Sequence, residues 1–201
     1  MGGIMKKVSL LVVFLLCGAF TVFARDTLPS PDVLGKESIF TSERLSAYDT
    51  IVVKAFATEG AELANLDDEE KKIVEEIKPT LVKNLKESLV KYLKKEGKFK
   101  NVLAGGTPKG KAIIVEGKFT KFNGGIGAAK FFLGWMAPES GKTNISVSGR
   151  LVDAKTGKEL ATFSDTRSGG EGGGLGRIRG VMPIQATDEG EEIANFIHKL
   201  Y

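Results

Sequence analysis

Residues 143–167, TNISVSGRLVDAKTGKELATFSDTR, contain the pattern that decides the fold. From Thr143 to Asp153, apolar or small residues alternate with polar ones, which predicts a strand with one buried and one polar face. Residues 153–157, DAKTG, have the composition of a tight turn. Glu159 to Arg167 is expected to return as the partner strand of a hairpin, although its apolar residues do not share one face.

Three further strands are predicted on the N-terminal side of this hairpin. Ala112 to Phe122 alternates in the same way as the hairpin strands. Thr50 to Ala57, TIVVKAFA, is dense in β-branched and apolar residues, which favours a central strand. Asn101 to Ala104 predicts a short additional strand.

The strongest helical signal extends from Asp67 to Glu96, where apolar residues recur every four positions. Acidic residues crowd the start and lysines crowd the end, and Gly97 follows, which suits the helix dipole and a left-handed stop. Pro79 lies inside this segment, so a kink or a break is expected near Lys78.

A second helix is predicted from Thr187 to the end of the chain, with Thr187 as its cap and Glu189 in a solvated first turn. The order of elements is β-α-β-β-β-β-α. It predicts an α/β (α+β) domain of two layers, in which a mostly antiparallel sheet of four to five strands packs both helices on one face. The polar strand faces would then contact water or a partner.

Residues 1–24 have the features of an export signal: Lys6-Lys7, an apolar run from Val8 to Phe20, and small residues before a cleavage point between Ala24 and Arg25. The run is too short to cross a bilayer as a helix. Acylation at Cys17 is the alternative, but it is disfavoured because the preceding Leu16 is large.

This reading predicts three parts and one compartment. Residues 1–24 form the signal peptide, 25–48 form an extended leader and 49–201 form one domain. The start at Met1 or Met5 stays open. The mature protein is expected in the periplasm or cell envelope.

Composition excludes several classes of function. The net charge of +4 falls to +2 without Lys6 and Lys7, too little to indicate a nucleic-acid partner. Cys17 is the chain's only cysteine, so the mature chain has no thiol for catalysis or for a metal site. The sole histidine, His198, is expected on the solvated surface of the last helix. No catalytic residue, cofactor site or metal site is predicted.

The stretches VEGKFTKFNGG (115–125), GRLVDAKTGKELATFSDTRSGG (149–170) and EGEEIANFI (189–197) resemble a family of exported bacterial domains known as domain of unknown function 4410. With Ile51-Val52-Val53, the resemblance covers nearly all of the mature chain. It implies a small envelope-associated domain without a known enzyme activity or catalytic motif.

One candidate contact segment is Gly124 to Pro138, which has one charge in 15 residues. It either contacts a membrane surface or another envelope protein, or folds back onto the domain. Its candidate contact residues are Phe131, Phe132, Leu133, Trp135 and Met136.

The second candidate is the glycine-rich loop that precedes the last helix, with Gly172, Gly173 and Gly174 and the cations Arg177 and Arg179. It is either a plain linker or an anion or lipid-head-group contact. Asp165 and Arg167 are interpreted as an ion pair or as a polar ligand contact. The leading hypothesis is a non-enzymatic envelope protein that acts through contacts; the alternative is an anion-binding module.

Overall fold

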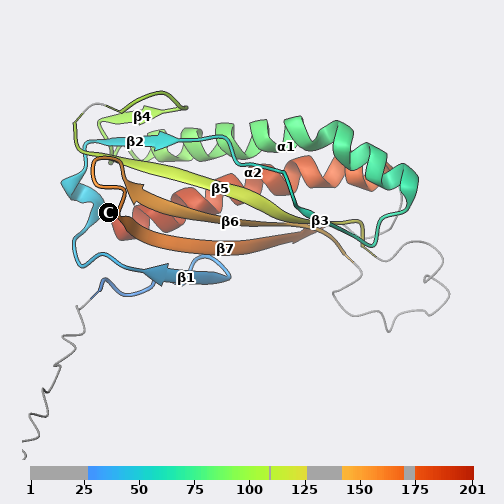
Figure 1. Ribbon diagram of the computed structural model, residues 1–201, viewed down its shortest axis with the longest axis horizontal. Coiled ribbons are helices and arrows are strands. Elements are labelled where there is room, and N and C mark those ends of the chain that lie inside the picture. Colours follow the sequence, from blue (N-terminus) through green and yellow to red (C-terminus); the bar gives the residue numbers. More distant parts are fainter. Residues whose placement is uncertain (1–26, 109, 126–141, 170–174) are drawn as a thin grey trace, which may run out of the picture.

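The computed structural model describes residues 27–108, 110–125, 142–169 and 175–201. They form a mixed α+β fold in which two long helices accompany a seven-stranded sheet (Figure 1). A short 3-10 helix, Leu45–Ala47, precedes the second strand. The longer elements are β1 Lys36–Ile39, β2 Thr50–Val53, β3 Glu62–Ala64, α1 Asp68–Lys95, β4 Asn101–Leu103, β5 Ala112–Asn123, β6 Thr143–Asp153, β7 Glu159–Gly169 and α2 Leu175–Leu200.

The sheet is mixed, and the prediction of four to five mostly antiparallel strands is wrong. Its order is β1-β7-β6-β5-β2-β4, with β3 paired to the far end of β5. The pairs β5–β6 and β6–β7 are antiparallel, whereas β2 pairs in parallel with both β4 and β5. The cause is α1, which returns the chain to the end where β2 begins, so that the strands placed beside β2 run in its direction.

The strands β1 and β3 were not predicted from the sequence because they are short. β1 lies in the range that was predicted as an extended leader, and it pairs antiparallel with β7 from Lys36 opposite Ser164 to Ile39 opposite Ala161. β3 pairs with residues 121–123 of β5. Strands of three or four residues show little periodicity of their own, and they form because a longer strand offers unpaired backbone groups.

The first helix begins with a capping box. The Asp67 side chain accepts hydrogen bonds from the backbone N–H of Glu69 and Glu70 at 3.0 and 2.8 Å, and the Glu70 carboxylate accepts the N–H of Asp67 at 3.0 Å. α1 then continues through Pro79 without a break, so of the kink or break expected near Lys78, the break is wrong. The packed apolar stripe on both sides of the proline compensates for the one missing hydrogen bond.

The second helix begins at Leu175, not at Thr187 as predicted. Thr187 is an interior residue, and its hydroxyl donates to the carbonyl of Pro183 at 3.0 Å. Glycines and a proline in the first turns hide the helical pattern in the sequence. Burial of Ile178 and Met182 stabilises those turns nevertheless.

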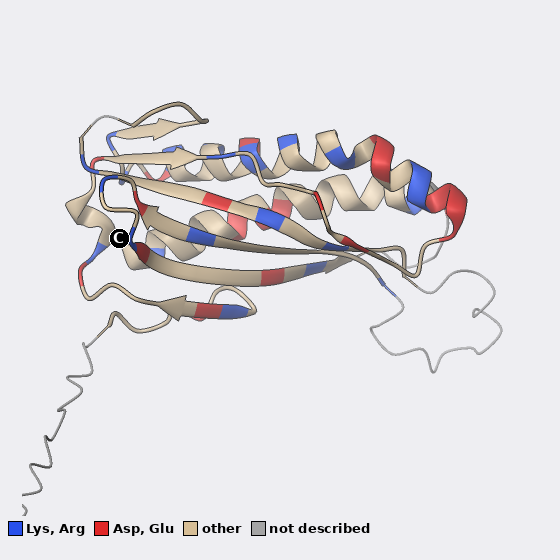
Figure 2. Cartoon of the chain, in the orientation of Figure 1, with Lys and Arg blue, Asp and Glu red and all other residues tan. Residues whose placement is uncertain are grey.

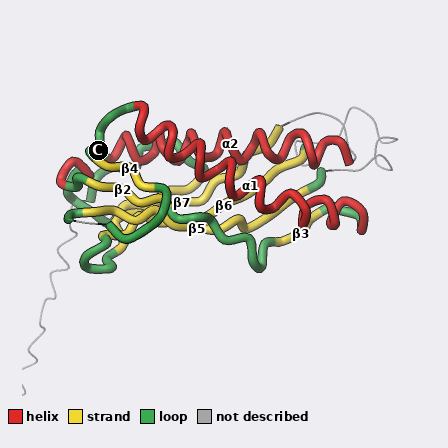
Figure 3. Tube along the Cα trace, turned by 90° about the horizontal axis from the view of Figure 1, so that it is seen from above, coloured by secondary structure: helices red, strands yellow, loops and turns green. Residues whose placement is uncertain are grey.

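Both helices lie on the same side of the sheet, as the view from above shows (Figure 3). Their backbones approach closely at Gly190, where a Cβ atom would overlap the backbone oxygen of Leu85 and come within 2.8 Å of the Ser88 Cβ. The core fills the space between helices and sheet. No helix in the described ranges is long and apolar enough to cross a membrane.

Candidate functional site

The sheet face opposite the helices carries polar side chains from β5, β6 and β7. On this open face the hydroxyls of Ser146 and Thr166 lie 2.8 Å apart and share a hydrogen bond across the two strands. The alternation predicted for β5 and β6 places their apolar partners on the helix side, where Val115, Phe119 and Ile145 are fully buried. The open face is therefore a surface of hydroxyls and charges that neither helix covers (Figures 1 and 3).

A chain of ion pairs crosses this open face. Lys54 donates to Glu116 at 2.7 Å, Arg150 donates to the other oxygen of Glu116 at 2.9 and 2.7 Å, and Arg150 also reaches Glu159 at 2.8 Å. Hydrogen bonds from Lys54 and then Arg150 hold the pKa of Glu116 below its usual value. Figure 2 shows these alternating charges on the strands of the sheet. Both signs are present and paired, so the open face has little net charge.

A shallow depression of about 590 Å³ lies among these side chains. Its lining includes Lys54, Glu116, Ser148, Arg150 and Thr162, which come from four segments of the chain. A second depression of about 480 Å³ lies farther along the same strands, with Ser146, Ser164 and Thr166 in its lining. The two hollows offer donors and acceptors to a polar partner.

A buried polar cluster lies between β7 and α2. Arg167 donates to Glu189 at 3.0 Å and pairs with Asp165 on its own strand. The other oxygen of Asp165 accepts the backbone N–H of Gly35 at 2.9 Å. The exposed fractions of the Glu189 and Asp165 side chains are 1% and 9%. This cluster therefore ties β7, α2 and the segment before β1 together.

Burial, followed by the charge of Asp165, raises the pKa of Glu189 to about 8. The positive charge of Arg167 opposes this increase in the pKa of Glu189. At neutral pH, Glu189 therefore holds a proton for most of the time, and Asp165 with Arg167 forms a neutral pair beside it. The arrangement resembles a carboxyl dyad in that one proton serves two acidic groups.

The sequence identified Asp165 and Arg167 as a pair but placed Glu189 in a solvated helix start, which is wrong. Because α2 begins near residue 175, position 189 lies in the middle of the helix and faces the sheet. The available signal was the spacing of Gln185, Glu189 and Ile193, which places all three on the apolar stripe of one helix.

His198 was expected at the solvated surface and is instead buried, with 8% of its area exposed. It lies where the ends of the two helices meet, and Lys98 donates to its backbone oxygen at 2.9 Å. Burial, with the nearby charge of Lys98, lowers the pKa of the imidazole. Across the described residues, no group of three or more His, Cys, Asp or Glu side chains is arranged to hold a metal ion.

The sequence profile of a family described as "Domain of unknown function (DUF4410)" matches residues 51–173. The chain belongs to this family. The match includes α1 and the strands β2 to β7, and thus the three strands β5, β6 and β7 whose polar side chains form the open face. No curated protein matches the chain.

Two solved structures are distantly similar to this DUF4410 chain. A PelC dodecamer from Paraburkholderia phytofirmans has 11% sequence identity and a TM-score of 0.44, over 81% of this chain and 97% of that one. Protein XCC0632 from Xanthomonas campestris, assigned to the DUF330 family, has 9% identity and a TM-score of 0.45, over 75% and 84%.

Several predicted residues of the DUF4410 chain lie outside the described ranges. Of the candidate anion contacts, Arg177 and Arg179 lie in the first turns of α2, and Arg179 forms two hydrogen bonds with Glu76 of α1, at 2.9 and 2.7 Å. An anion at Arg179 would have to compete with this carboxylate. The predicted residues that lie outside the described ranges are Cys17, the cleavage point Ala24–Arg25, the apolar contacts Phe131, Phe132, Leu133, Trp135 and Met136, and the glycines Gly172, Gly173 and Gly174.

Proposed function

We propose that this protein is an exported, non-enzymatic component of the bacterial cell envelope that binds another envelope protein through the open face of its sheet. The observation that carries the proposal is the one-sided construction of the domain. Two helices cover one face of a seven-stranded sheet, and the other face presents paired charges and hydroxyls around two shallow depressions.

The chemistry of the open face favours a protein partner. A lipid surface or a nucleic acid selects a patch of a single sign, whereas Lys54, Glu116 and Arg150 alternate in sign and neutralise one another. Charge pairs of this kind can exchange partners with complementary groups on another protein, which gives specificity and orientation. The hydroxyls of β6 and β7 supply further hydrogen bonds without a strong preference for charge.

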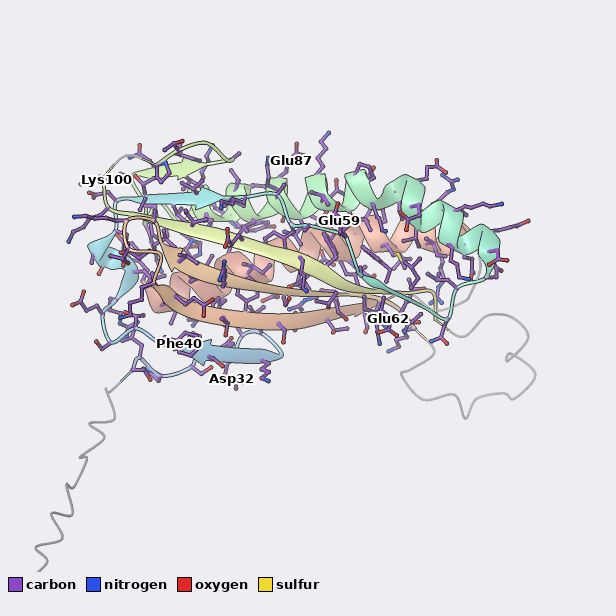
Figure 4. The ribbon with its side chains drawn as sticks, in the orientation of Figure 1. Asp32, Phe40, Glu59, Glu62, Glu87 and Lys100 are labelled. Carbon is purple, nitrogen blue, oxygen red and sulfur yellow. The ribbon has the colours of Figure 1, made fainter. Side chains whose placement is uncertain are left out.

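Site-specific photocrosslinking in the cells that naturally carry the gene tests this assignment. A photoreactive residue is placed on the open face at Ser148 or Thr162, and a matched control is placed on the outer side of α1 at Thr80 or Glu87. Figure 4 shows Glu87 on the helix layer, away from the sheet. We expect one discrete adduct from both open-face positions and none from the helix positions. Equal adducts from both sets, or none from the open face, would refute the proposal.

Charge reversal provides a second readout. Exchange of all four charges, with Lys54→Glu, Glu116→Lys, Arg150→Glu and Glu159→Lys, preserves the net charge and the local pairing but reverses the pattern that a partner meets. The adduct from Thr162 is expected to disappear while the melting temperature changes little. An adduct of unchanged yield would show that the ion-pair pattern is not what the partner recognises.

The segment Gly124–Pro138 is included in the proposal as a second contact. Replacing Phe131, Phe132 and Trp135 with Ser is expected to abolish association and to leave the fold intact, since the three side chains form the apolar part of the segment. Sedimentation of the protein with its partner measures association, and far-UV circular dichroism measures the fold. Association that survives the triple change would eliminate this contact.

A further inference from the structure

Positive charge gathers at one end of the molecule. Six exposed lysines lie there without a carboxylate partner among the described residues, and they come from α1, the start of β5, the turn between β6 and β7, and α2. They are Lys94, Lys95, Lys111, Lys155, Lys158 and Lys199, and together they are called the basic end.

Backbone hydrogen bonds show that these segments are neighbours. Asn101 donates to Asp49, Asp49 donates to Lys111, and Ala154 donates to Ala112, at 3.1, 3.2 and 2.9 Å, which links β4, β2, β5 and the β6–β7 turn in one row. The helix ends join the same row, because Lys98 donates to the backbone of His198 at 2.9 Å. Figure 4 labels Lys100, which lies at this end.

Acidic groups at the basic end are mostly engaged. Asp49 pairs with Lys100 at 2.8 Å. Asp153 accepts the hydroxyl of Tyr48 at 2.8 Å and the N–H groups of Lys155 and Thr156 at 2.9 and 2.7 Å. Asp153 keeps its negative charge, and Glu43 and Glu96 are exposed at the same end. The lysines outnumber these carboxylates, so the basic end stays net positive toward an external partner.

The opposite end carries both signs of charge. Residues 59–70 contain six Asp or Glu and no Lys or Arg, but Lys71 pairs with Asp68, Lys121 pairs with Glu62 and Arg179 pairs with Glu76 (Figure 2). An anionic surface would therefore attract the basic end more strongly than this end. The charge distribution thus fixes an orientation as well as an affinity.

The N-terminal segment joins the domain at the basic end. Leu28 donates to the carbonyl of Thr41, and Phe40 donates to that of Leu160, both at 2.9 Å, which places the first described residues beside the β6–β7 turn. The predicted export signal precedes this point in the sequence, so the basic end is where the leader joins the domain.

We propose that the basic end binds the surface of an anionic phospholipid bilayer and orients the domain with the start of α1 away from the membrane. A cluster of basic side chains is attracted to an anionic membrane surface by electrostatics. Each lysine close to an anionic surface contributes about a fivefold increase in partitioning. The inference rests on the proposed envelope location but not on the open-face contact.

Vesicle co-sedimentation tests it on the protein recovered from cells that express the full chain. The vesicles are pure phosphatidylcholine, or phosphatidylcholine with 30% phosphatidylglycerol. The test variant carries Lys111→Glu, Lys155→Glu and Lys158→Glu, and the control carries Lys72→Glu, Lys83→Glu and Lys118→Glu. These control lysines are exposed and lie away from the basic end, so the two variants have the same net charge.

The wild-type chain is expected to bind the anionic vesicles better than the neutral ones, with an advantage that falls steeply as salt is raised. The basic-end variant should lose roughly a hundredfold of this partitioning, and the control only a few-fold. Equal losses in both variants would mean that net charge alone attracts the protein, and no preference for anionic vesicles would mean that lipid is not the partner. Either result overturns the inference. Open-face crosslinks report on the other contact, so each proposal can fail alone.

Discussion

Replacing Glu189 with Gln is expected to remove the largest pH dependence of stability between pH 5 and 8. The carboxyl group of Glu189 is buried against β7, where Asp165 and Arg167 are its charged neighbours, and Glu192 on the next turn of α2 adds a weaker charge that acts on Arg167. An amide at position 189 keeps the shape, donates to Asp165 and accepts from Arg167. It therefore imitates the protonated acid at every pH.

The direction and the size of this pH dependence follow from the difference between the pKa values of Glu189 in the folded and unfolded states. The pKa of Glu189 is about 8 in the folded protein and close to its ordinary value of 4.5 in the unfolded chain. The folded state therefore binds more protons between these values, so its stability is full below about pH 4.5 and is lost as the pH rises to 8. For a group that titrates alone, this loss corresponds to about 5 kcal/mol of unfolding free energy. The carboxyl–carboxyl coupling to Asp165 makes this figure an upper bound.

Urea unfolding followed by circular dichroism, at pH 5, 6, 7 and 8, measures the effect. The difference in unfolding free energy between Glu189→Gln and the wild type should grow by several kcal/mol from pH 5 to pH 8, with the variant the more stable at pH 8. Taking the difference cancels other titrating groups, including His198, whose lowered pKa acts in the opposite direction. A difference that stays constant over this range would refute the assignment of a shared proton to the cluster.

Three further changes test the packing and the turns. Gly190→Ala places a methyl group against α1 and should lower the unfolding free energy by about 2 kcal/mol in urea titrations. The control Gly180→Ala lies in the same helix with open space around it, and it should raise the unfolding free energy by up to about 1 kcal/mol. Equal effects of the two changes would contradict the close approach of the helices. Asp67→Ala removes the capping box and should cost about 1 kcal/mol, unlike Asp68→Ala one position later. Glu37→Ala removes the acceptor for three successive backbone N–H groups and a serine hydroxyl, so cleavage by a protease before β1 should accelerate at pH 7. Because hydrogen bonds outweigh burial and lower the pKa of Glu37, this difference should shrink as the pH falls below 4.

The long strands and the first helix could be predicted because their patterns are periodic and long. β5 and β6 occupy nearly the residues that alternate, and α1 begins and ends within one residue of the predicted bounds. Their burial is determined locally, since alternate positions must face either the core or the solvent. Strand direction cannot be predicted in this way, because it depends on the end of the sheet to which the connecting helix returns the chain. No residue pattern within β2 or β5 records that information.

Helix α2 shows why the polar cluster escaped prediction. Gly176, Gly180 and Pro183 all weaken a helix in isolation, so the sequence favoured a glycine-rich loop over residues 168–181 and a helix only from about Thr187. Contacts with α1 and the sheet override this preference in the folded chain. Because the predicted helix began at Thr187, Glu189 was assigned to its first turn, where acidic residues are ordinarily solvated. Its burial could therefore not be predicted.

The segment Gly124–Pro138 and the basic end belong to opposite ends of the domain, so we expect them to contact different partners. The segment Gly124–Pro138 leaves from the ends of β5 and β6 where Asn123 pairs with Asn144, whereas the basic end lies where Ile113 pairs with Asp153. The twelve residues of β5 span about 40 Å. The segment therefore leaves the domain at the end of β5 that lies away from the basic end. Accordingly, replacing Phe131, Phe132 and Trp135 with Ser should leave binding to anionic vesicles unchanged, and a loss of that binding would place the membrane at the wrong end of the domain.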